Sequence, residues 1–567
     1  MNKKWVIREE IPAAARNHLA RWDAEPLIQQ LFWNRGLENE EQALAFVRRE
    51  NSFDDDPFQL TSMDAAIERI LAGLDADESI VVYGDYDVDG VTATRLMVEV
   101  LEAFGANVSS YVPRRDSEGY GLHSSVLENM KKEGVSLVLT VDCGVRAVEQ
   151  AAYARSLGMD LIISDHHYVG EVLPDAVAVI NPKRPDCHYP EHMLSGVGIA
   201  NKISDALLRR RSPVQAEILP RSFLDLVALG TVADLAPLCG ENRTLVYSGL
   251  EQLNSVPRPG IMALMQAAGS KGPVTARTIG FQLGPRLNAA GRMGSVLDAL
   301  QLLATRNTEE ATQLAQGLEE LNRERQNLTK KISERALEMA HAQVGDEDPK
   351  IFFAAHAEFH SGIVGLAASR LCEEFHRPAL VAQRKDGMIT GSARSVEHFH
   401  ISEALLQCAD LLDRHGGHAV AAGFTLPEEN WKQLKGRLRE IAIGQLSGKD
   451  LRPTLSIDAV VESSQLTQRL AEQLEYFEPS GNGNPTPVFV WRGAPVLGKR
   501  VVGKNGDHLK LKTRTENGLE IDVIGFWLGD RLPTLSATAD LAFSFENNEW
   551  RGRKRQQLNL KDVSAST

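Results

Sequence analysis

Short hydrophobic runs and amphipathic stretches alternate in the first half of the chain, over roughly residues 78–182. The short runs are rich in β-branched side chains and predict buried strands, whereas the longer stretches between them predict helices. The predicted strands are Ser79–Tyr83, Ser136–Val141, Asp160–Ile163 and Ala176–Ile180, and the predicted helices are Thr92–Phe104 and Ala147–Leu157. This alternation is typical of an α/β fold with a mostly parallel, doubly wound sheet. Ligands bind at the carboxyl ends of the strands in such sheets, so functional residues are expected there.

Three further patterns follow along the chain. Between Thr308 and Ala342 there is no proline and one glycine, and apolar residues recur near a spacing of three to four, which predicts a long connector helix. A second α/β pattern covers about Asp348–Gly448. After Asp450 come short alternating strands such as His508–Thr513 and Leu519–Ile524, separated by Asn-Gly turn signals. This last segment predicts a small β-barrel of the oligonucleotide-binding (OB) type.

These patterns predict several domains, as a length of 567 residues also favours. The predicted parts are an N-terminal lead segment (1–49), a catalytic α/β domain (50–300), a connector helix (301–347), a second α/β domain (348–449) and a nucleic-acid-binding OB domain (450–567).

Composition excludes few classes of protein. A hydrophobic content of 43% and a charged content of 24% are ordinary for a globular protein. The five cysteines are scattered without a Cys-x-x-Cys pair, which argues against a disulfide framework and against structural zinc. No apolar run approaches the ~20 residues that span a bilayer. We expect a cytoplasmic protein with no membrane partner. The net charge of −14 does not exclude nucleic-acid binding, because binding depends on local patches.

Three aspartates leave the end of the first predicted strand at every second position, namely Asp85, Asp87 and Asp89. In extended backbone alternate side chains share a face, so at least two carboxylates are expected to converge. Converging carboxylates repel one another unless a cation compensates them, and Mg²⁺ and Mn²⁺ prefer such oxygen ligands. A calcium-binding EF-hand is excluded, because the motif follows a strand and Leu96 occupies the position of the required glutamate.

The next two predicted strands also end in metal-ligand residue types. Asp142 ends one strand, and Asp165, His166 and His167 end the next; Asp234 follows later in Leu229–Asp234. Three successive strand ends with such residues are hard to explain by packing. Mixed imidazole and carboxylate ligation suits Mn²⁺ and tolerates Mg²⁺. The spacing leaves open whether one ion or two would bind.

These motifs resemble those of the DHH phosphoesterase superfamily, and within it those of RecJ-type exonucleases. Asp85–Gly90 and Asp165-His166-His167 resemble the two superfamily motifs, and Gly416-Gly417-His418 with Ala421–Phe424 resembles the companion DHHA1 domain. Pro113–Leu122 and Gly284–Arg292 resemble RecJ-type segments. The resemblance covers nearly the whole chain in the right order. It implies a DHH domain, a connector helix, a DHHA1 domain and a C-terminal OB barrel.

The resemblance also implies roles for individual residues. The implied metal ligands are Asp87, Asp89, Asp142, His166 and Asp234, with Asp89 or Asp142 as the bridge and Asp85 as a ligand or the partner of one. Asp165 would orient a histidine, and His167 would face the scissile phosphate as a hydrogen-bond donor or general acid. The implied contacts to the 5′-phosphate or to DNA are Arg115, Arg286, Asn288, Arg370, Ser392, Arg394 and His418, with Lys504, Arg551 and Arg553 in the barrel.

The implied function is a single-stranded-DNA-specific 5′→3′ exonuclease that releases 5′-mononucleotides by two-metal hydrolysis with Mg²⁺ or Mn²⁺, in DNA recombination and repair. The implied partners are single-strand-binding protein and a RecQ-type helicase, and a monomer is expected. Two alternatives stay open from the sequence. One is a DHH-family phosphodiesterase for short oligoribonucleotides or cyclic dinucleotides. The other is a non-catalytic DNA-binding scaffold.

Overall fold

The chain divides into two compact units in a computed structural model that describes residues 3–19, 24–49, 56–115, 118–212, 221–345, 348–550 and 553–566. One unit, here called the two-sheet unit, comprises Asp56–Asp234 and Gly249–Arg452. The other, here called the barrel unit, comprises Met1–Asp55, Leu235–Ser248 and Pro453–Thr567. Each unit is built from segments that are far apart in the sequence.

The first sheet of the two-sheet unit has five parallel strands in the order β3-β2-β4-β5-β6. The strands are β2 (Ser79–Tyr83), β3 (Asn107–Tyr111), β4 (Val135–Val141), β5 (Asp160–Ser164) and β6 (Ala178–Ile180). The helices around it are α4 (Met63–Asp75), α5 (Val88–Ala103), α6 (Ser124–Lys132), α7 (Val148–Ser156) and α8 (Gly196–Arg210), preceded by the short η1 (Pro57–Gln59). Helices α5 and α8 pack on one face of the sheet, and α6 and α7 pack on the other. The predicted doubly wound α/β fold is therefore confirmed.

The direction of the strand order changes between β2 and β4, because β3 lies on one side of β2 and all later strands lie on the other. Such a reversal opens a crevice at the carboxyl ends of the strands, where ligands bind in open α/β sheets. The sequence did not predict β3, which is largely exposed and polar. It also placed the start of the first helix too late. Helix α5 begins at Val88 rather than Thr92, so the three aspartates do not form the extended run that alternation would require.

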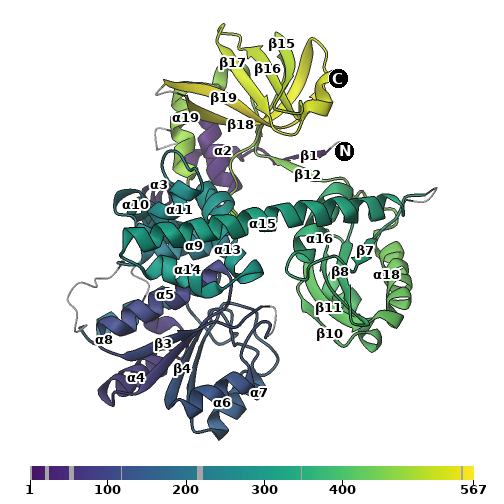
Figure 1. The fold of residues 1–567 in the computed structure, drawn as a ribbon. Coiled ribbons are helices and arrows are strands. Elements are labelled where there is room, and N and C mark those ends of the chain that lie inside the picture. Colours follow the sequence, from purple (N-terminus) through teal and green to yellow (C-terminus); the bar gives the residue numbers. More distant parts are fainter. Residues whose placement is uncertain are drawn as a thin grey trace. The chain divides into compact units, whose positions relative to one another are not determined.

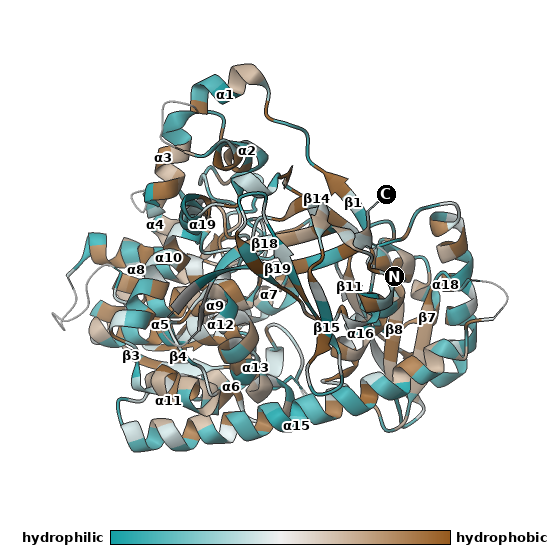
Figure 2. Ribbon diagram, turned by 90° about the horizontal axis from the view of Figure 1, so that it is seen from above, coloured by the Kyte–Doolittle hydropathy of each residue, from teal (hydrophilic) through white to brown (hydrophobic). Residues whose placement is uncertain are grey.

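A helical layer follows the first sheet. Its helices are α9 (Leu224–Ala233), α11 (Pro259–Ala267), α12 (Ala276–Thr278), the π-helical turn η2 (Ile279–Leu283), α13 (Gly284–Met293) and α14 (Val296–Ala304). The intervening α10 (Gly240–Ser255) is divided between the units, since its residues up to Ser248 belong to the barrel unit. The predicted connector is α15 (Thr308–His341), whose N-cap Asn307 accepts hydrogen bonds from the amides of Glu309 and Glu310. It packs first on α11, α13 and α14 and then on α16 and β7, so one helix supports both halves of the unit (Figure 1). Hydrophilic and hydrophobic residues alternate along α15, as Figure 2 shows.

The second sheet has the order β10-β11-β9-β8-β7, with β7 and β8 parallel and the other pairs antiparallel. Its strands are β7 (Phe352–His356), β8 (Ala379–Lys385), β9 (Met388–Arg394), β10 (Arg414–Gly417) and β11 (Ala421–Pro427). The associated helices are α16 (Val364–Phe375), α17 (Ile401–Leu406) and α18 (Trp431–Leu446), with the short turns η3 (Ala409–Leu411) and η4 (Glu428–Asn430). The second predicted α/β region is confirmed, with a mixed rather than a parallel sheet.

The barrel unit contains a seven-stranded sheet in the order β13-β14-β18-β19-β17-β16-β15. Its strands are β13 (Ala459–Val460), β14 (Phe489–Pro495), β15 (Gly498–Val502), β16 (His508–Arg514), β17 (Glu520–Gly525), β18 (Thr538–Trp550) and β19 (Arg553–Ala565). The turns that join them carry η5 (Ser463–Gln465), α19 (Gln468–Leu474), η6 (Glu475–Phe477) and η7 (Gly529–Thr534). Gly506 and Gly518 adopt φ of +72° and +82° at the two predicted Asn-Gly turns, a conformation that favours glycine.

The N-terminal segment belongs to the barrel unit, which the sequence patterns did not predict. Strand β1 (Lys4–Ile7) pairs in parallel with β12 (Thr454–Ile457). Helices α1 (Ala13–Leu19), α2 (Pro26–Asn34) and α3 (Glu40–Arg48) follow it. Phe32 of α2 shares one core with Phe489 and Phe543 of the barrel strands. Among the described helices, none combines the length and the apolar character that a membrane-spanning segment needs.

Candidate metal centre and anion site

Three neighbouring strands and one helix end bring the predicted metal ligands together. Asp85 follows β2, and Asp87 caps α5 by accepting a hydrogen bond from the Gly90 amide at 3.1 Å. Asp89 then lies in the first turn of α5. Asp142 follows β4, His166 follows β5, and Asp234 caps the carboxyl end of α9. Convergence therefore comes from a strand-to-helix turn, and not from alternation along an extended strand.

The ligand atoms form three overlapping groups within 4.8 Å of one another, namely Asp89-His166-Asp234, Asp142-His166-His167 and Asp85-Asp87-Asp142. Nε2 of His166 lies 3.1 Å from Oδ1 of Asp142 and 3.8 Å from Oδ2 of Asp234. It lies 3.9 Å from Oδ2 of Asp89. Because Asp142 and His166 are each shared between groups, the arrangement offers room for two adjacent cations.

Several of these atoms are buried without a hydrogen-bond partner, including Oδ1 of Asp85, Oδ1 of Asp142 and Nε2 of His166. Burial and neighbouring carboxylates raise the pKa of Asp85, Asp89 and Asp142 well above the usual range. Burial, and then Asp87, raises the pKa of Asp234 to about 7. Burial, and then His167, lowers the pKa of His166 to about 3, so its imidazole is neutral and offers a lone pair. This donor set fits hard divalent cations such as Mn²⁺ and Mg²⁺.

Backbone groups fix two of the carboxylates. The amides of Gly196 and Val197, at the start of α8, donate to the two oxygens of Asp89 at 2.6 and 2.9 Å. Asp142 has a φ of +61°, an uncommon conformation for a residue with a side chain. A Cβ on Gly196 would lie 2.7 Å from the Cβ of Asp142, so only glycine fits there. The helix α8 therefore holds both Asp89 and Asp142 in place.

His167 is held by Asp165. Asp165 is fully buried and accepts hydrogen bonds from the amides of Val145 and His167 at 2.9 and 3.0 Å. Its Oδ1 also lies 2.8 Å from Nδ1 of His167. Burial alone would lower the pKa of His167, but the bond to Asp165 raises it. The hydroxyl of Tyr120, to which the sequence assigned no role, lies 3.3 Å from the same ring nitrogen. The bond to Asp165, which raises the pKa of His167, favours the doubly protonated imidazolium, in which Nδ1–H donates to Asp165 and Nε2–H is free to donate.

Beside the carboxylates lies a cluster of arginines, Arg115, Arg292 and Arg394, that have no carboxylate partner in the described part of the chain. The Arg115 guanidinium stacks 5.0 Å from the ring of Tyr86, which stands between Asp85 and Asp87. Arg292 donates to the carbonyl of Gly362 at 3.2 Å, and burial, followed by Arg115, lowers its pKa to about 10. Burial and then Arg115 also lower the pKa of Arg394. Unpaired, mutually repelling cations of this kind suit a phosphate anion.

The second sheet contributes Ser392 and Arg394 to this cluster through β9. A Cβ on Gly365 of α16 would lie 3.2 Å from Nη2 of Arg394 and 3.3 Å from Oγ of Ser392, so α16 packs closely on both side chains. Arg292 was not among the residues chosen from the sequence, although it ends the segment Gly284–Arg292 that carried the resemblance. The sequence signal that could have identified Arg292 was a basic residue at the end of this glycine-containing segment.

The other predicted phosphate contacts are placed differently. Arg286 is paired with Glu319 at 2.7 Å and also donates to the carbonyl of Gln282. Arg370 is exposed on α16. His418 is exposed, and its ring lies 6.3 Å from that of Tyr168, which follows His167. Asn288 lines a small cavity together with Arg292.

Known proteins share this organisation. The DHH family, N-terminal domain, matches residues 79–231, the DHHA1 domain matches residues 348–443, and the RecJ OB domain matches residues 457–562. The chain is 37% identical to the single-stranded-DNA-specific exonuclease RecJ of Bacillus subtilis over 99% of this chain and 71% of that protein. It is 34% identical to RecJ of Salmonella typhimurium over 95% of this chain and 96% of that protein. The chain belongs to the RecJ family. The crystal structure of RecJ from Thermus thermophilus in complex with Mn²⁺ is similar, with a TM-score of 0.85 and 30% identity over 99% of this chain and 79% of that one.

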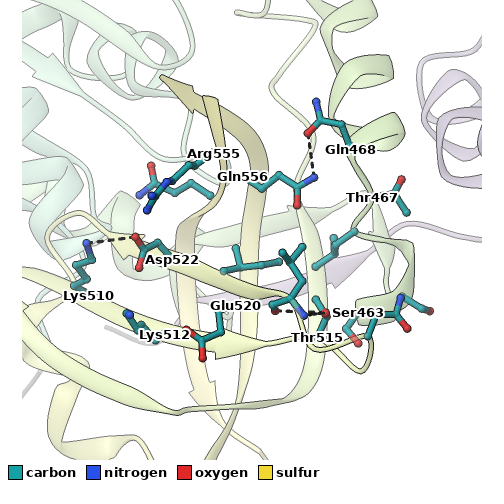
Figure 3. A pocket seen from close by; sticks show the side chains of 16 residues that line it. Ser463, Thr467, Gln468, Lys510, Lys512, Thr515, Glu520, Asp522, Arg555 and Gln556 are labelled. Carbon is teal, nitrogen blue, oxygen red and sulfur yellow. Dashed lines mark hydrogen bonds and ion pairs between the residues drawn. The ribbon is translucent and has the colours of Figure 1, made fainter. Parts of the chain in front are cut away.

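The RecJ OB domain of this chain carries a polar groove of about 1390 Å³, seen in Figure 3. It is lined by outward-facing residues of β16, β17 and β19 on one side and by the start of α19 on the other. Lys510 pairs with Asp522 at 3.7 Å, whereas Lys512 and Arg555 have no ion-pair partner among the described residues. The predicted contact Lys504 is exposed in the turn after β15 and does not line the groove. Arg551 and the side chain of Arg553 lie outside what the structure describes.

Proposed function

We propose that this RecJ-family chain hydrolyses single-stranded DNA from its 5′ end and releases 5′-mononucleotides, as a metal-dependent exonuclease in recombination and repair. One observation carries the proposal. A buried cluster of carboxylates and neutral His166, whose inward atoms have no hydrogen-bond partner, adjoins a cluster of arginines without carboxylate partners among the described residues. A cation site beside an anion site is what hydrolysis of a terminal phosphodiester requires.

Two Mn²⁺ or Mg²⁺ ions would be held by Asp87, Asp89, Asp142, His166 and Asp234, with Asp85 at the edge of the same group. When bound, such cations stabilise the charge on the phosphodiester and lower the pKa of the attacking water. Asp142 is the best candidate for a bridging ligand, because it belongs to two of the three groups and its Oδ1 is unsatisfied.

His167 would donate a hydrogen bond from Nε2 to a non-bridging oxygen of the scissile phosphate. Asp165 supports this role by accepting from Nδ1, which fixes the orientation of the ring and stabilises the imidazolium that carries a hydrogen on Nε2. The breaking bond joins phosphorus to the 3′ oxygen of the terminal nucleotide. The terminal nucleotide leaves with its own 5′-phosphate, and the next nucleotide keeps a new 5′-phosphate.

The terminal 5′-phosphate would bind to Arg115, Ser392 and Arg394, with Arg292 as a further cation. The stacking of Arg115 on Tyr86 supports this assignment, because Tyr86 lies between two aspartates of the metal cluster. A phosphate anchored there would hold the next phosphodiester at a fixed distance from the carboxylates. This arrangement would give 5′ polarity and release of one nucleotide per cycle.

Preference for single strands would come from a site between the two sheets that admits one strand, since Arg115 comes from the first sheet's side and Arg394 from the second. In the OB domain, Lys512 and Arg555 would bind backbone phosphates, and the amides of Gln468 and Gln556 would contact bases. Lys504, Arg551 and Arg553 remain proposed DNA contacts.

We further propose single-strand-binding protein and a RecQ-type helicase as partners, a monomeric state and a cytoplasmic location. None of the five cysteines, all of which lie in the described part of the chain, forms a disulfide, which supports a reducing compartment. The division into a catalytic domain at 50–300, a connector at 301–347, a DHHA1 domain at 348–449 and an OB domain at 450–567 is also a proposal.

The decisive experiment is degradation of 5′-phosphorylated single-stranded DNA labelled at either end, with Mn²⁺, Mg²⁺ or EDTA, beside blunt duplex and RNA. Asp89→Ala is the inactive variant, and Asp298→Asn, an exposed aspartate of α14, is its matched control. We expect immediate release of the 5′ label as mononucleotide, dependent on metal and on Asp89, with the duplex spared. Turnover of only di- or trinucleotides would assign the chain to short oligonucleotides. Binding without cleavage in the presence of every metal tested would support the alternative of a non-catalytic DNA-binding scaffold.

A further inference from the structure

A small cavity of about 160 Å³ lies in the two-sheet unit between the first sheet's helical layer and α16. Its wall includes Arg292 of α13 and Arg325 of α15, with Asn288 beside them. Ala233, which also lines it, directly precedes the proposed metal ligand Asp234. The cavity is therefore adjacent to the metal centre and has two cationic side chains and no carboxylate in its wall.

Neither cation is neutralised in the described part of the chain. The only side-chain partner of Arg325 found there is Oδ1 of Asn322, at 2.8 Å from Nη2, which leaves Nη1 free. Arg292 donates one N–H to the carbonyl of Gly362. Glu319, an acidic side chain of α15, is already paired with Arg286 at 2.7 Å and with Arg323 at 2.6 Å. Two half-buried guanidiniums that face one cavity without a counter-charge indicate an anionic ligand.

The backbone explains why there is a cavity. Pro285 has no N–H, and its ring excludes an α-helical carbonyl four residues earlier. The chain widens there into the π-helical turn Ile279–Leu283, which the Gly284 amide closes by donating to the carbonyl of Ile279. π-helical turns inside helices are frequent at functional sites. A Cβ on Gly280, which lines the cavity, would meet only Cγ1 of Val232 at 4.0 Å, so the space is kept open by the missing side chain.

From this geometry we infer that Arg325 binds an internal phosphate of the substrate strand, distinct from the scissile phosphate and from the terminal 5′-phosphate. The inference rests on the proposed function. Asn288 and Arg292 complete the pocket, and Arg292 connects it to the cluster that would hold the terminal phosphate. The ligand class is a nucleic-acid phosphodiester, because the cavity is too small for a whole nucleotide and one of its lining residues, Ala233, directly precedes Asp234. The strand would thus be held on both sides of the bond that breaks.

The test compares Arg325→Gln with Arg335→Gln, an exposed arginine on the same helix that pairs with Glu338 and lies outside the cavity. Substrates are 5′-phosphorylated and 5′-hydroxyl strands, and a series in which one phosphodiester at a time is a neutral methylphosphonate. Arg325→Gln is expected to lower kcat/KM about tenfold, equally for strands with either 5′ end. Arg335→Gln is expected to leave kcat/KM unchanged. When the methylphosphonate replaces the phosphate that Arg325 contacts, the Arg325→Gln variant and the unchanged protein should have equal kcat/KM. When binding is measured in EDTA, Arg325→Gln should make the slope of log K against log salt concentration shallower by about 0.7.

Gly280→Leu is a second variant, which fills the cavity and keeps both arginines; it is expected to weaken binding of the same strands. Thermal unfolding of each variant checks its folding. The inference is overturned if the Arg325→Gln defect disappears on 5′-hydroxyl strands, because that residue would then serve the terminal phosphate. It is also overturned if the defect persists with every methylphosphonate, or if no defect occurs. If the unchanged protein neither binds nor degrades single strands, the proposed function itself has failed.

Discussion

Gly196 lies so close to Asp142 that a Cβ at position 196 would come within 2.7 Å of the Asp142 Cβ and 2.8 Å of its Oδ1. The first residue of α8 therefore sets the position of a central carboxylate of the metal cluster. The same residue donates its amide to Asp89 at 2.6 Å. One glycine thus positions two proposed ligands, one through its N–H and the other through its missing side chain.

Gly196→Ala should displace Asp142 and lower the affinity for Mn²⁺ by about 10- to 100-fold, the range found when groups that orient metal ligands are changed. Calorimetric titration with Mn²⁺ measures this directly. Gly436→Ala in α18 is the matched control, because a Cβ there meets nothing within 4 Å. That change should leave Mn²⁺ affinity unaltered and stabilise the helix by about 0.5–1 kcal/mol. Equal Mn²⁺ affinity in both variants would contradict the positioning role of Gly196.

Asp165→Asn should lower kcat about 10- to 100-fold and leave Mn²⁺ affinity nearly unchanged. The asparagine keeps the shape of the side chain but removes the charge that holds Nδ1 of His167 at 2.8 Å. Single-turnover cleavage and Mn²⁺ titration separate the two effects. If metal affinity fell as far as kcat, Asp165 would belong to the ligand set and not to the support of His167.

Arg394→Ala should reduce the preference for 5′-phosphorylated over 5′-hydroxyl strands, whereas Arg286→Ala should not. Arg394 has no carboxylate partner in the described part of the chain, but Arg286 is committed to Glu319 at 2.7 Å. Loss of Arg286 should instead destabilise the protein by about 1–3 kcal/mol, because a charge-assisted hydrogen bond between α13 and α15 is lost. Relative kcat/KM on the two strands and urea unfolding measure these outcomes. A changed 5′ preference in Arg286→Ala would return that residue to the phosphate site.

Lys512→Gln combined with Arg555→Gln should weaken binding of long single strands and have little effect on strands of a few nucleotides. Both cations line the groove of the OB domain without an ion-pair partner among the described residues (Figure 3). Two lost phosphate contacts should lower the salt slope of binding by about 1.4. Fluorescence anisotropy against strand length and salt tests this. Lys499→Gln is the control, because the Lys499 ammonium donates to the Leu535 carbonyl outside the groove.

Glu99 should contribute to stability at neutral pH and lose that contribution in acid. It lies 2.5 Å from Arg258 and 2.6 Å from Arg95. Burial alone would raise the pKa of Glu99, but these arginines lower it below its ordinary value of 4.5. A lowered folded-state pKa means stability that is present above pH 4.5 and is lost as the pH falls through the folded value. Glu99→Gln should therefore unfold at a lower temperature at pH 7, with a smaller difference from the unchanged protein at pH 3. An equal difference at both pH values would contradict the ion pair's contribution.

The metal cluster could be predicted because its signals are local. Asp85, Asp142 and His166 each follow a short β-branched run, and parallel strands carry their carboxyl ends to one edge of a sheet. The start of α5 was also readable, since Asp87 caps the Gly90 amide three residues later. The prediction that the three aspartates lie in extended backbone overlooked that signal.

Tertiary structure alone decided the rest, because it depends on residues that are far apart in sequence. Whether an arginine binds phosphate or a carboxylate cannot be read from its neighbours: Arg286 finds Glu319 on α15, whereas Arg292, six residues later, finds none among the described residues. The pairing of β1 with β12 likewise joins segments about 450 residues apart. The sequence by itself determined which strand ends carry metal-ligand chemistry, since strand and ligand adjoin in the chain. Only packing determined which cations stay unpaired, since charge neutralisation acts through space.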